Sequence, residues 1–433
     1  MSWSRFDLGA GVIVVPGLDL IWDQVSDLVD VVEVEPQTMW RSRPGGWDLV
    51  EPAFQWVEAL GLPTLVHGVG FPVGGCHPPD PAGVALTAEC AARLGAAHWS
   101  EHLSFNRTVL GNRSIDAGFL LPPAQTTAGV EVAAEHVRAY HAAAHLPFLV
   151  ETGVNYLRPR PGELSDGAYI AGVAGRADCG ILLDLHNLLT NERNGRQPVS
   201  EVLDELPLER VLEVHVAGGF EAGGYYLDAH VGAPDEELLA LTASVIPRLP
   251  NLRAVMYEAV PESLAALGAA GVREILVALH RLLDGARRAK GQDRQPRPRQ
   301  PRPRQPRPRQ PGPRRQRPGA GPGGAGLAAS AAWERALAAY TSRASDDRAA
   351  DDPGIGLLRQ LADAARRGGL ALACPDQLGR LIAELGIEAT EGLVDRYLRD
   401  RRPLRWTADE GAQFVSWLAE TEPALLAEAA ATT

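Results

Sequence analysis

The sequence has few cysteines and lacks any long hydrophobic run. Its four cysteines, in a chain of 433 residues, lie far apart without C-x-x-C spacing, which excludes a disulfide framework and a zinc ribbon. No stretch approaches about 18 uncharged apolar residues, so we expect no transmembrane helix. The N-terminus lacks a basic segment followed by an apolar core, so we expect no signal peptide and a cytoplasmic protein.

Acidic residues are nearly missing from residues 287–317, which hold 13 basic residues and one acid. This segment contains QPRPR three times in tandem, and its prolines and mutually repelling arginines cannot build a core. We therefore expect a disordered linker over 287–326, a domain of residues 1–286 before it and a domain of residues 327–433 after it. No aromatic residue is interleaved with the arginines, so nucleic-acid binding is not favoured.

Residues 1–286 alternate short β-branched apolar runs with helical patterns. Eight such runs, separated by about 30–45 residues, predict an α/β fold, the (β/α)8 TIM barrel. An open doubly wound sheet is the alternative, which is disfavoured because no G-x-G-x-x-G turn follows the first run. The expected strands are residues 6–14, 29–35, 63–68, 96–104, 146–151, 179–185, 210–216 and 252–258.

The last six of these runs each carry a histidine or a carboxylate at or near their C-terminal end. In a barrel of parallel strands these ends meet at one mouth, where active sites are built. The loops after the sixth and seventh runs add an asparagine and an Asp-x-His pair. The residues are His67, His102, Glu151, Asp184, His215 and Glu258 at the strand ends, and Asn187, Asp228 and His230 in the loops.

So many histidines and carboxylates can crowd together only with cations between them. Mixed imidazole and carboxylate ligands suit iron, manganese or zinc, and this number of ligands implies more than one ion. A carboxylate such as Glu151 can bridge two metals. The absence of cysteine at the strand ends disfavours an iron–sulfur cluster.

Seven motifs occur in the order of a known family. They are HGVG (67–70), SEHLSF (100–105), ETGVNYL (151–157), LLDLHNLLTN (182–191), EVHVAGG (213–219), the Asp-x-His pair at 228–230 and the closing YE (257–258). Together they resemble the multinuclear non-heme iron-dependent oxidases, the MNIO or DUF692 family, over about residues 6–285. The resemblance implies a barrel with about two to three iron ions that uses O2 to oxidise a side chain, most often cysteine, of a ribosomally made precursor peptide.

The resemblance also implies the metal ligands. The two early histidines of the family correspond to His67 and His102, and its bridging glutamate corresponds to Glu151. The aspartate and asparagine of its sixth strand correspond to Asp184 and Asn187. The remaining ligands correspond to His215, Asp228, His230 and Glu258.

Two positions depart from the family pattern. Thr152 and Gly153 follow the bridging glutamate where the family reads asparagine and proline, and His186 stands where asparagine is common. His186 is a candidate extra ligand, proton donor or plain loop residue. Tyr156 lies near the ligands and is a candidate catalytic residue or a packing residue.

Two other functions fit parts of the sequence. A zinc- or manganese-dependent TIM-barrel endonuclease or sugar isomerase uses a similar ligand set, but a nuclease needs a basic face and residues 1–286 carry a net charge of −19. A non-catalytic binding or scaffold protein would carry its function in the linker and the tail. The bound metal and its redox dependence would discriminate between these functions.

Residues 327–433 show helical periodicity, and Thr407 followed by Glu410 predicts a capping box. Iron oxidases of this family often work with a small separate helper protein that presents the precursor peptide. We hypothesise that this domain is a fused equivalent of the helper, the alternatives being a dimerisation bundle or an unrelated interaction domain. The expected helices are residues 333–344, 354–368, 374–386, 389–401 and 407–430.

Overall fold

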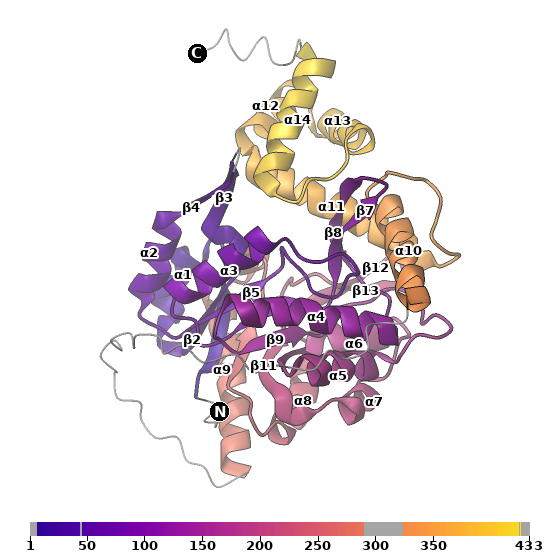
Figure 1. The fold of residues 1–433 in the computed structure, drawn as a ribbon. Coiled ribbons are helices and arrows are strands. Elements are labelled where there is room, and N and C mark those ends of the chain that lie inside the picture. Colours follow the sequence, from indigo (N-terminus) through magenta and orange to yellow (C-terminus); the bar gives the residue numbers. More distant parts are fainter. Residues whose placement is uncertain (1–6, 44–45, 290–323, 424, 426–433) are drawn as a thin grey trace.

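The computed structural model describes residues 7–43, 46–289, 324–423 and 425 of the chain. Most of the expected linker therefore lies outside the described residues. The described chain forms a closed barrel ringed by helices, and a second group of helices stands over one end of that barrel (Figure 1).

Eight parallel strands close the barrel in the order β1-β14-β11-β10-β9-β6-β5-β2. Each of the eight runs predicted from the sequence contains one of these strands, so the (β/α)8 barrel is confirmed. The strands are β1 (Gly9–Val14), β2 (Val31–Val34), β5 (Thr64–Gly68), β6 (Trp99–His102), β9 (Phe148–Glu151), β10 (Gly180–Asp184), β11 (Val211–Val216) and β14 (Ala254–Tyr257).

Helices connect the strands on the outside, because parallel neighbours need a crossover connection. Asp80, Thr126, Ser165 and Asp235 each cap a helix by accepting a backbone N–H of its first turn. The helices are α1 (Leu18–Val25), α2 (Glu51–Leu60), α3 (Pro81–Arg93), α4 (Thr127–Ala143), α5 (Asp166–Ala177), α6 (Leu185–Arg193), α7 (Val199–Glu205), α8 (Glu236–Val245) and α9 (Pro261–Ala289).

Side chains alternate along each strand between the barrel interior and the surrounding helices. Leu149 and Leu182 belong to a small apolar cluster that is separate from the large core beneath the helices. Two residues later on the same strands, Glu151 and Asp184 share their direction and are also buried. The interior thus has an apolar floor below a layer of ionisable side chains.

Three antiparallel hairpins follow barrel strands and therefore stand at the mouth. The sequence analysis did not predict them, although Gly111 and Asn112 between two alternating runs are a turn signal for the second. The hairpins are β3 (Trp40–Arg43) with β4 (Gly46–Leu49), β7 (Phe105–Leu110) with β8 (Arg113–Leu121), and β12 (Gly219–Ala222) with β13 (Tyr225–Asp228).

The region beyond the expected linker is helical, as predicted. Figure 1 shows α10 and α11 lying along the β7–β8 hairpin, with α12, α13 and α14 standing beyond them. These helices are α10 (Gly324–Thr341), α11 (Pro353–Ala373), α12 (Pro375–Leu385), α13 (Ile387–Asp400) and α14 (Thr407–Thr421).

The barrel loops and the first two of these helices share one apolar cluster. It combines Leu121 of β8 and Tyr156 of the loop after β9 with Ile355 and Leu358 of α11. A Cβ on Gly354 would stand 2.2 Å from the carbonyl oxygen of Tyr156, so only glycine permits this approach. The C-terminal helices are therefore packed against the barrel mouth and do not stand apart from it.

The predicted capping box at the start of α14 is wrong. The N-cap is Trp406, where the described residues provide no side-chain cap, and the buried Glu410 pairs instead with Arg366. The hydroxyl of Tyr397 donates to the same carboxylate at 2.8 Å. A buried guanidinium requires a carboxylate partner more strongly than the N–H groups of a helix start do, because those groups can bind water.

Among the described helices, α9 alone is long and apolar enough to cross a membrane by length and composition. It carries Arg273 and Glu274 near its middle, so it is not an uncharged run. Its buried residues Val272, Leu276 and Leu279 belong to the core cluster of the barrel. Packing against the barrel accounts for its apolar face.

Candidate metal centre at the barrel mouth

The first group of site residues comes from β5, β6 and β9. Glu151 Oε2 lies 3.1 Å from His67 Nε2 and 2.8 Å from His102 Nε2. The other ring nitrogens are held by the protein, His67 Nδ1 at 2.8 Å from Ser100 Oγ and His102 Nδ1 at 3.0 Å from the Gly68 carbonyl oxygen. This anchoring orients both rings with Nε2 towards the site, as metal-ligating histidines require.

The second group surrounds the start of α6. Asp184 ends β10 and caps the helix, its Oδ1 accepting the Asn187 N–H at 2.8 Å. Asn187 Nδ2 donates to Glu151 Oε1 at 3.1 Å. Thr152 Oγ1 accepts the Asp184 N–H at 2.9 Å, so this departure from the family pattern links the ends of β9 and β10.

The third group comes from β11, from the end of β13 and the loop that follows it, and from the residue after β14. His215 Nδ1 lies 3.1 Å from Glu258 Oε2, and His230 Nδ1 lies 3.5 Å from Glu258 Oε1. His230 Nε2 lies 2.9 Å from Asp228 Oδ1. His230 has a φ of +52°, a backbone conformation that is uncommon outside glycine and is often found at functional sites.

The three groups join into one site. Ligand atoms of Glu151, Asp184 and His215 lie within 4.8 Å of one another, and so do those of His67, His102 and Glu151. The structure thus brings all nine predicted residues together. Their roles as ligands stay a prediction.

Burial and neighbouring charges shift the pKa values of the carboxylates in the site. Burial opposes ionisation of Glu151, but the imidazoles of His102 and His67 hold its pKa well below the ordinary value. Burial, together with the carboxylates of Glu151 and Glu258, raises the pKa of Asp184 well above its ordinary value. The neighbouring carboxylates therefore disfavour ionisation of Asp184, and a cation bound beside it would relieve that repulsion.

Some buried polar atoms at the mouth lack a hydrogen-bond partner among the described residues. Within the described part of the chain, Asp184 Oδ2 and Asn187 Oδ1 are buried and have no hydrogen-bond partner. Burying such atoms is costly unless a partner compensates them. Oxygen and imidazole donors together suit iron, manganese or zinc, so the residues fit a metal centre.

The sequence analysis missed three fully buried ionisable residues beneath the mouth, Glu33, Glu213 and His98. Glu33 Oε2 lies 2.9 Å from His215 Nε2, and Glu213 Oε2 lies 2.8 Å from His98 Nε2. A signal was present, because Glu213 lies two residues before His215 on one strand and so shares its inward face. Glu33 likewise interrupts an apolar run.

His186 and Tyr156 both contact Asp228. His186 Nδ1 lies 3.0 Å from Asp228 Oδ1, and the Tyr156 hydroxyl accepts the Asp228 N–H at 3.0 Å. His186 is buried, with its ring centroid 5.8 Å from that of Tyr226. The two candidate catalytic residues therefore lie behind Asp228.

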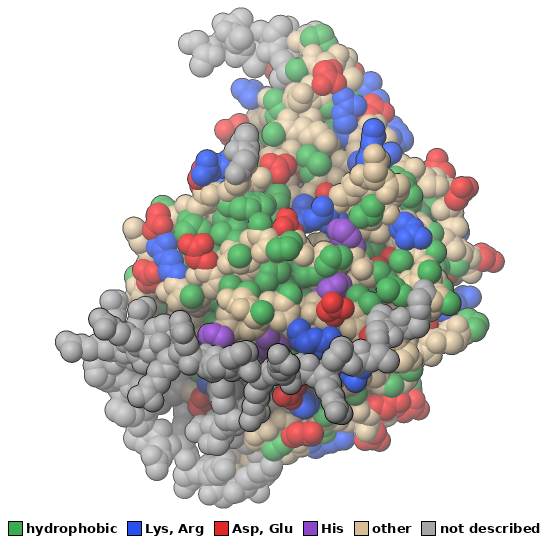
Figure 2. All heavy atoms as spheres, viewed as in Figure 1, with side chains coloured by type: hydrophobic (Ala, Val, Ile, Leu, Met, Phe, Trp, Pro, Cys, Tyr) green, Lys and Arg blue, Asp and Glu red, His purple; other side chains and the backbone are tan. Residues whose placement is uncertain are grey.

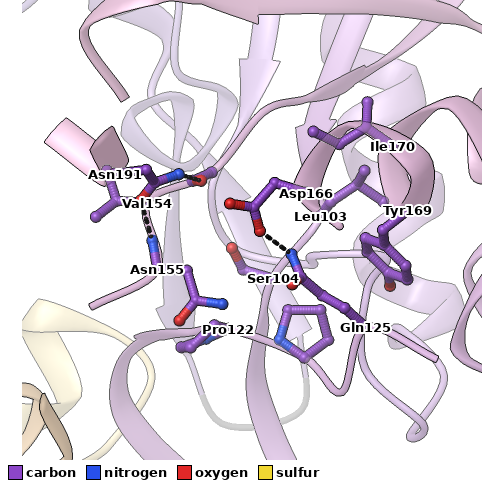
Figure 3. A pocket seen from close by; sticks show the side chains of 12 residues that line it. Leu103, Ser104, Pro122, Gln125, Val154, Asn155, Asp166, Tyr169, Ile170 and Asn191 are labelled. Carbon is purple, nitrogen blue, oxygen red and sulfur yellow. Dashed lines mark hydrogen bonds between the residues drawn. The ribbon is translucent and has the colours of Figure 1, made fainter. Parts of the chain in front are cut away.

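The side chain of Asn191 on α6 holds the loop after β9 through two hydrogen bonds. Asn191 Oδ1 accepts the Asn155 N–H at 2.7 Å, and Asn191 Nδ2 donates to the Gly153 carbonyl oxygen at 3.2 Å. Figure 3 shows Asn155 and Asn191 beside a cavity of about 20 Å³, which Gln125 and Asp166 also line, with Gln125 Nε2 donating to Asp166 Oδ1 at 2.9 Å. Such a volume suits about one water molecule and is too small for a substrate.

A larger cleft opens onto the candidate metal centre. It encloses about 890 Å³ and is lined by His230 and Glu258 at its inner end. The His230 side chain is 26% exposed, whereas those of His67 and His215 are fully buried. The site is therefore reached from the His230 side, and the volume falls in the range of ligand pockets.

A closed (β/α)8 barrel with histidines and carboxylates converging at the C-terminal ends of its strands defines a TIM-barrel scaffold with a candidate metal centre. The chain belongs to the family described as the RiPP precursor modification enzymes MbnB/TglH/ChrH, whose sequence model matches residues 18–260. Members of this family act on precursor peptides of ribosomally synthesised, modified products. The family resemblance seen in the motifs is thereby confirmed.

Relatives described as UPF0276 proteins occur in several bacteria. One from Streptomyces avermitilis is 33% identical over 231 residues, covering 48% of this chain and 47% of the relative. One from Chromobacterium violaceum is 32% identical over 187 residues, covering 43% of this chain and 66% of the relative. The chain thus spans about half to two thirds of the length of these relatives.

Among solved structures, the chain is similar to a D-psicose 3-epimerase from Clostridium cellulolyticum, with a TM-score of 0.42 and 11% identity over 65% of this chain and 98% of the other. It is also similar to a 3-keto-D-glucoside 4-epimerase from E. coli, with a TM-score of 0.39 and 13% identity over 63% and 99% of the two chains. Similarity at this level carries no argument about function.

Proposed function

We propose that this chain is a multinuclear iron-dependent oxidase that uses O2 to modify a cysteine side chain of a ribosomally made precursor peptide. Membership of the RiPP modification family supports the peptide substrate. The observation that carries the proposal is the set of buried carboxylates and histidines that meet around Glu151. We expect about two to three iron ions, because this number of donors exceeds the needs of one ion.

Glu151 is the residue best placed to serve two ions. Its Oε2 faces His67 and His102, while its Oε1 accepts from Asn187 beside Asp184. Each of its oxygens therefore belongs to a different group of donors, the arrangement that a bridging carboxylate needs. When bound, iron supplies redox chemistry with O2 and lowers the pKa of a coordinated thiol.

Around the centre, the residues of the chain orient the ligands. Asp228 is held on one side by His186 Nδ1 and on the other by the Tyr156 hydroxyl. We therefore propose that His186 and Tyr156 are positioning residues for Asp228. Fixing a ligand in this way sets the ring and carboxylate orientations on which metal affinity and activity depend.

The region of residues 327–433 takes the place of a helper protein in this proposal. Residues of α11 and α14 line the cleft that leads to His230 and Glu258. A precursor peptide bound there would pass directly to the metal centre. The cytoplasm supplies such a peptide from the ribosome, and we expect the protein there.

The test is purification of the full chain without air, followed by metal analysis and O2 uptake with precursor peptides encoded beside its gene. We expect about two to three iron ions per chain, lost together on chelation, and peptide-dependent O2 consumption. One zinc ion per chain with activity that ignores O2 would support an isomerase or nuclease. A chain that binds no metal in stoichiometric amount would support a scaffold.

A further inference from the structure

The cleft at the barrel mouth has one wall from the barrel and one from the C-terminal helices. Trp406 anchors the second wall, its ring centroid lying 5.1 Å from that of Trp47 and 5.5 Å from that of Phe71. A Cβ on Gly70 would stand 3.0 Å from the Trp406 ring, so the contact is close. Because Trp406 also lines the cleft, the C-terminal helices complete it.

The C-terminal wall presents apolar surface to the cleft. Leu372, at the end of α11, is 63% exposed and lines the cleft together with Ala373 and Trp406. An exposed leucine alone is ordinary. Here it stands over a cavity of about 890 Å³ that continues to His230, so an apolar side chain of a bound chain could cover it.

Basic side chains lie at the outer part of the cleft, although residues 1–286 carry a net charge of −19. Arg41 and Arg405 both line it. Arg405 Nε and Nη2 lie 3.3 Å from Asp116 Oδ1, which leaves further donors of its guanidinium for a ligand. On the face drawn in Figure 2, basic and histidine side chains lie where the barrel meets the C-terminal helices.

We propose that this cleft binds the segment of the precursor peptide beside the modified residue, with an acidic residue of the peptide against Arg41 and Arg405 and an apolar residue against Leu372 and Trp406. The identity of the occupant as a precursor peptide rests on the proposed function. The continuity of the cleft with His230 and Glu258 carries the placement, and the two arginines carry the charge preference.

The probe is a displayed library of short peptides with a fixed cysteine between varied positions, selected on the immobilised, metal-free full chain. We expect enrichment of sequences with an aspartate or glutamate and a large apolar residue near the cysteine. A synthetic peptide of the enriched sequence should bind more weakly by about tenfold when its acid is replaced by lysine. Enrichment without acidic residues, or no enrichment, would overturn the proposal.

Matched variants locate the binding surface. Leu372→Glu should weaken the enriched peptide by about tenfold, because it removes apolar contact and repels the acid. Ile387→Glu is the control, since Ile387 is 62% exposed on the same helical region and is not among the described residues that line the cleft. Equal loss in both variants, or in neither, would contradict the cleft as the site.

A second pair of variants tests the preference of the cleft for an acidic peptide. Arg41→Glu should abolish the preference for the acidic peptide over its lysine counterpart, whereas Arg43→Glu on the same strand should keep it. Thermal midpoints of the four variants check that each is folded. Because binding is measured without metal, a failure of iron or O2 chemistry would overturn the oxidase and leave this result standing.

Discussion

Two of the regions with buried charges in the described part of the chain satisfy those charges differently. Between the C-terminal helices, Arg366 Nε donates to Glu410 at 2.8 Å, and its other nitrogens donate to the carbonyl oxygens of Leu398 and Arg401 at 3.2 Å and 2.9 Å. The second oxygen of Glu410 accepts the Leu404 N–H at 2.7 Å. This group of charges is closed, with donors and acceptors matched inside the protein.

At the barrel mouth, some buried polar atoms have no hydrogen-bond partner among the described residues. Asp184 Oδ2 and Asn187 Oδ1 find no hydrogen-bond partner in the described ranges, and carboxylates lie close to one another. Both regions are buried to a similar extent, so burial does not separate a structural ion pair from a ligand site. Unmatched polar atoms distinguish the two regions, because burying such atoms is costly unless a ligand or a water molecule compensates them.

The largest expected effect tests the region at the barrel mouth. Glu151→Ala should remove at least one iron ion per chain and lower turnover by more than about 100-fold, because the oxygens that join the two groups of donors are lost. The metal-free variant should stay folded, since the change also removes a buried charge. Metal analysis and circular dichroism check both points, and full iron content would remove Glu151 from the centre.

The second prediction removes a buried carboxylate from the Arg366–Glu410 region. Glu410→Ala should lower the free energy of unfolding by about 3–5 kcal/mol, because it leaves the Arg366 guanidinium buried without its carboxylate. The iron content of the folded fraction should not change. Urea unfolding and metal analysis measure the two quantities. A variant that lost iron as Glu151→Ala does would break the distinction between the regions.

A third prediction concerns Glu334, which joins α10 to the barrel. It accepts the Cys76 N–H at 2.7 Å, and burial raises its pKa to about 7, with Arg160 among the charges nearby. The folded state therefore holds its proton more tightly than the unfolded state. Its contribution is most favourable below the unfolded pKa of 4.5 and is lost as the pH rises towards about 7.

Glu334→Gln should consequently be more stable than the parent by about 3 kcal/mol at pH 8 and equal to it near pH 4. Chemical unfolding of the full chain at several pH values measures this difference. The exposed Glu391→Gln on α13 is the control and should not change the pH dependence. A parallel shift of the Glu334→Gln curve at all pH values would show that its ionisation plays no part.

The smallest effect concerns the residues behind Asp228. His186→Asn should lower kcat by about tenfold and leave the iron content intact, because it loosens a ligand without removing it. Tyr156→Phe removes the acceptor of the Asp228 N–H and should also lower kcat. Loss of iron in His186→Asn to the extent expected for Glu151→Ala would instead make His186 a ligand.

Much of the barrel and of its site could be predicted from local sequence. The strands follow from short β-branched runs at regular spacing, and the inward direction of His67, Glu151 and Asp184 follows from their place at strand ends. The family motifs added the loop residues. Glu33 and Glu213 were missed although the same alternation places Glu213 on the inward face with His215.

Glu410 shows why local patterns fail in the C-terminal region. The sequence favours it as part of a capping box with Thr407, yet Arg366, far away in the chain, takes its carboxylate. A local turn signal in the sequence indicates the β7–β8 hairpin. No local signal indicates that this hairpin packs against α10 and α11. Contacts of this kind join segments that no short window of sequence contains.

The sequence by itself determined the eight strands, the helices and the identity of the residues at the strand ends, because each depends on the period of side chains within one element. Only the tertiary structure decided that the C-terminal helices form a wall of the cleft. Trp406 reaches Trp47 and Phe71 through packing between segments distant in the chain, and periodicity does not specify which apolar surfaces meet.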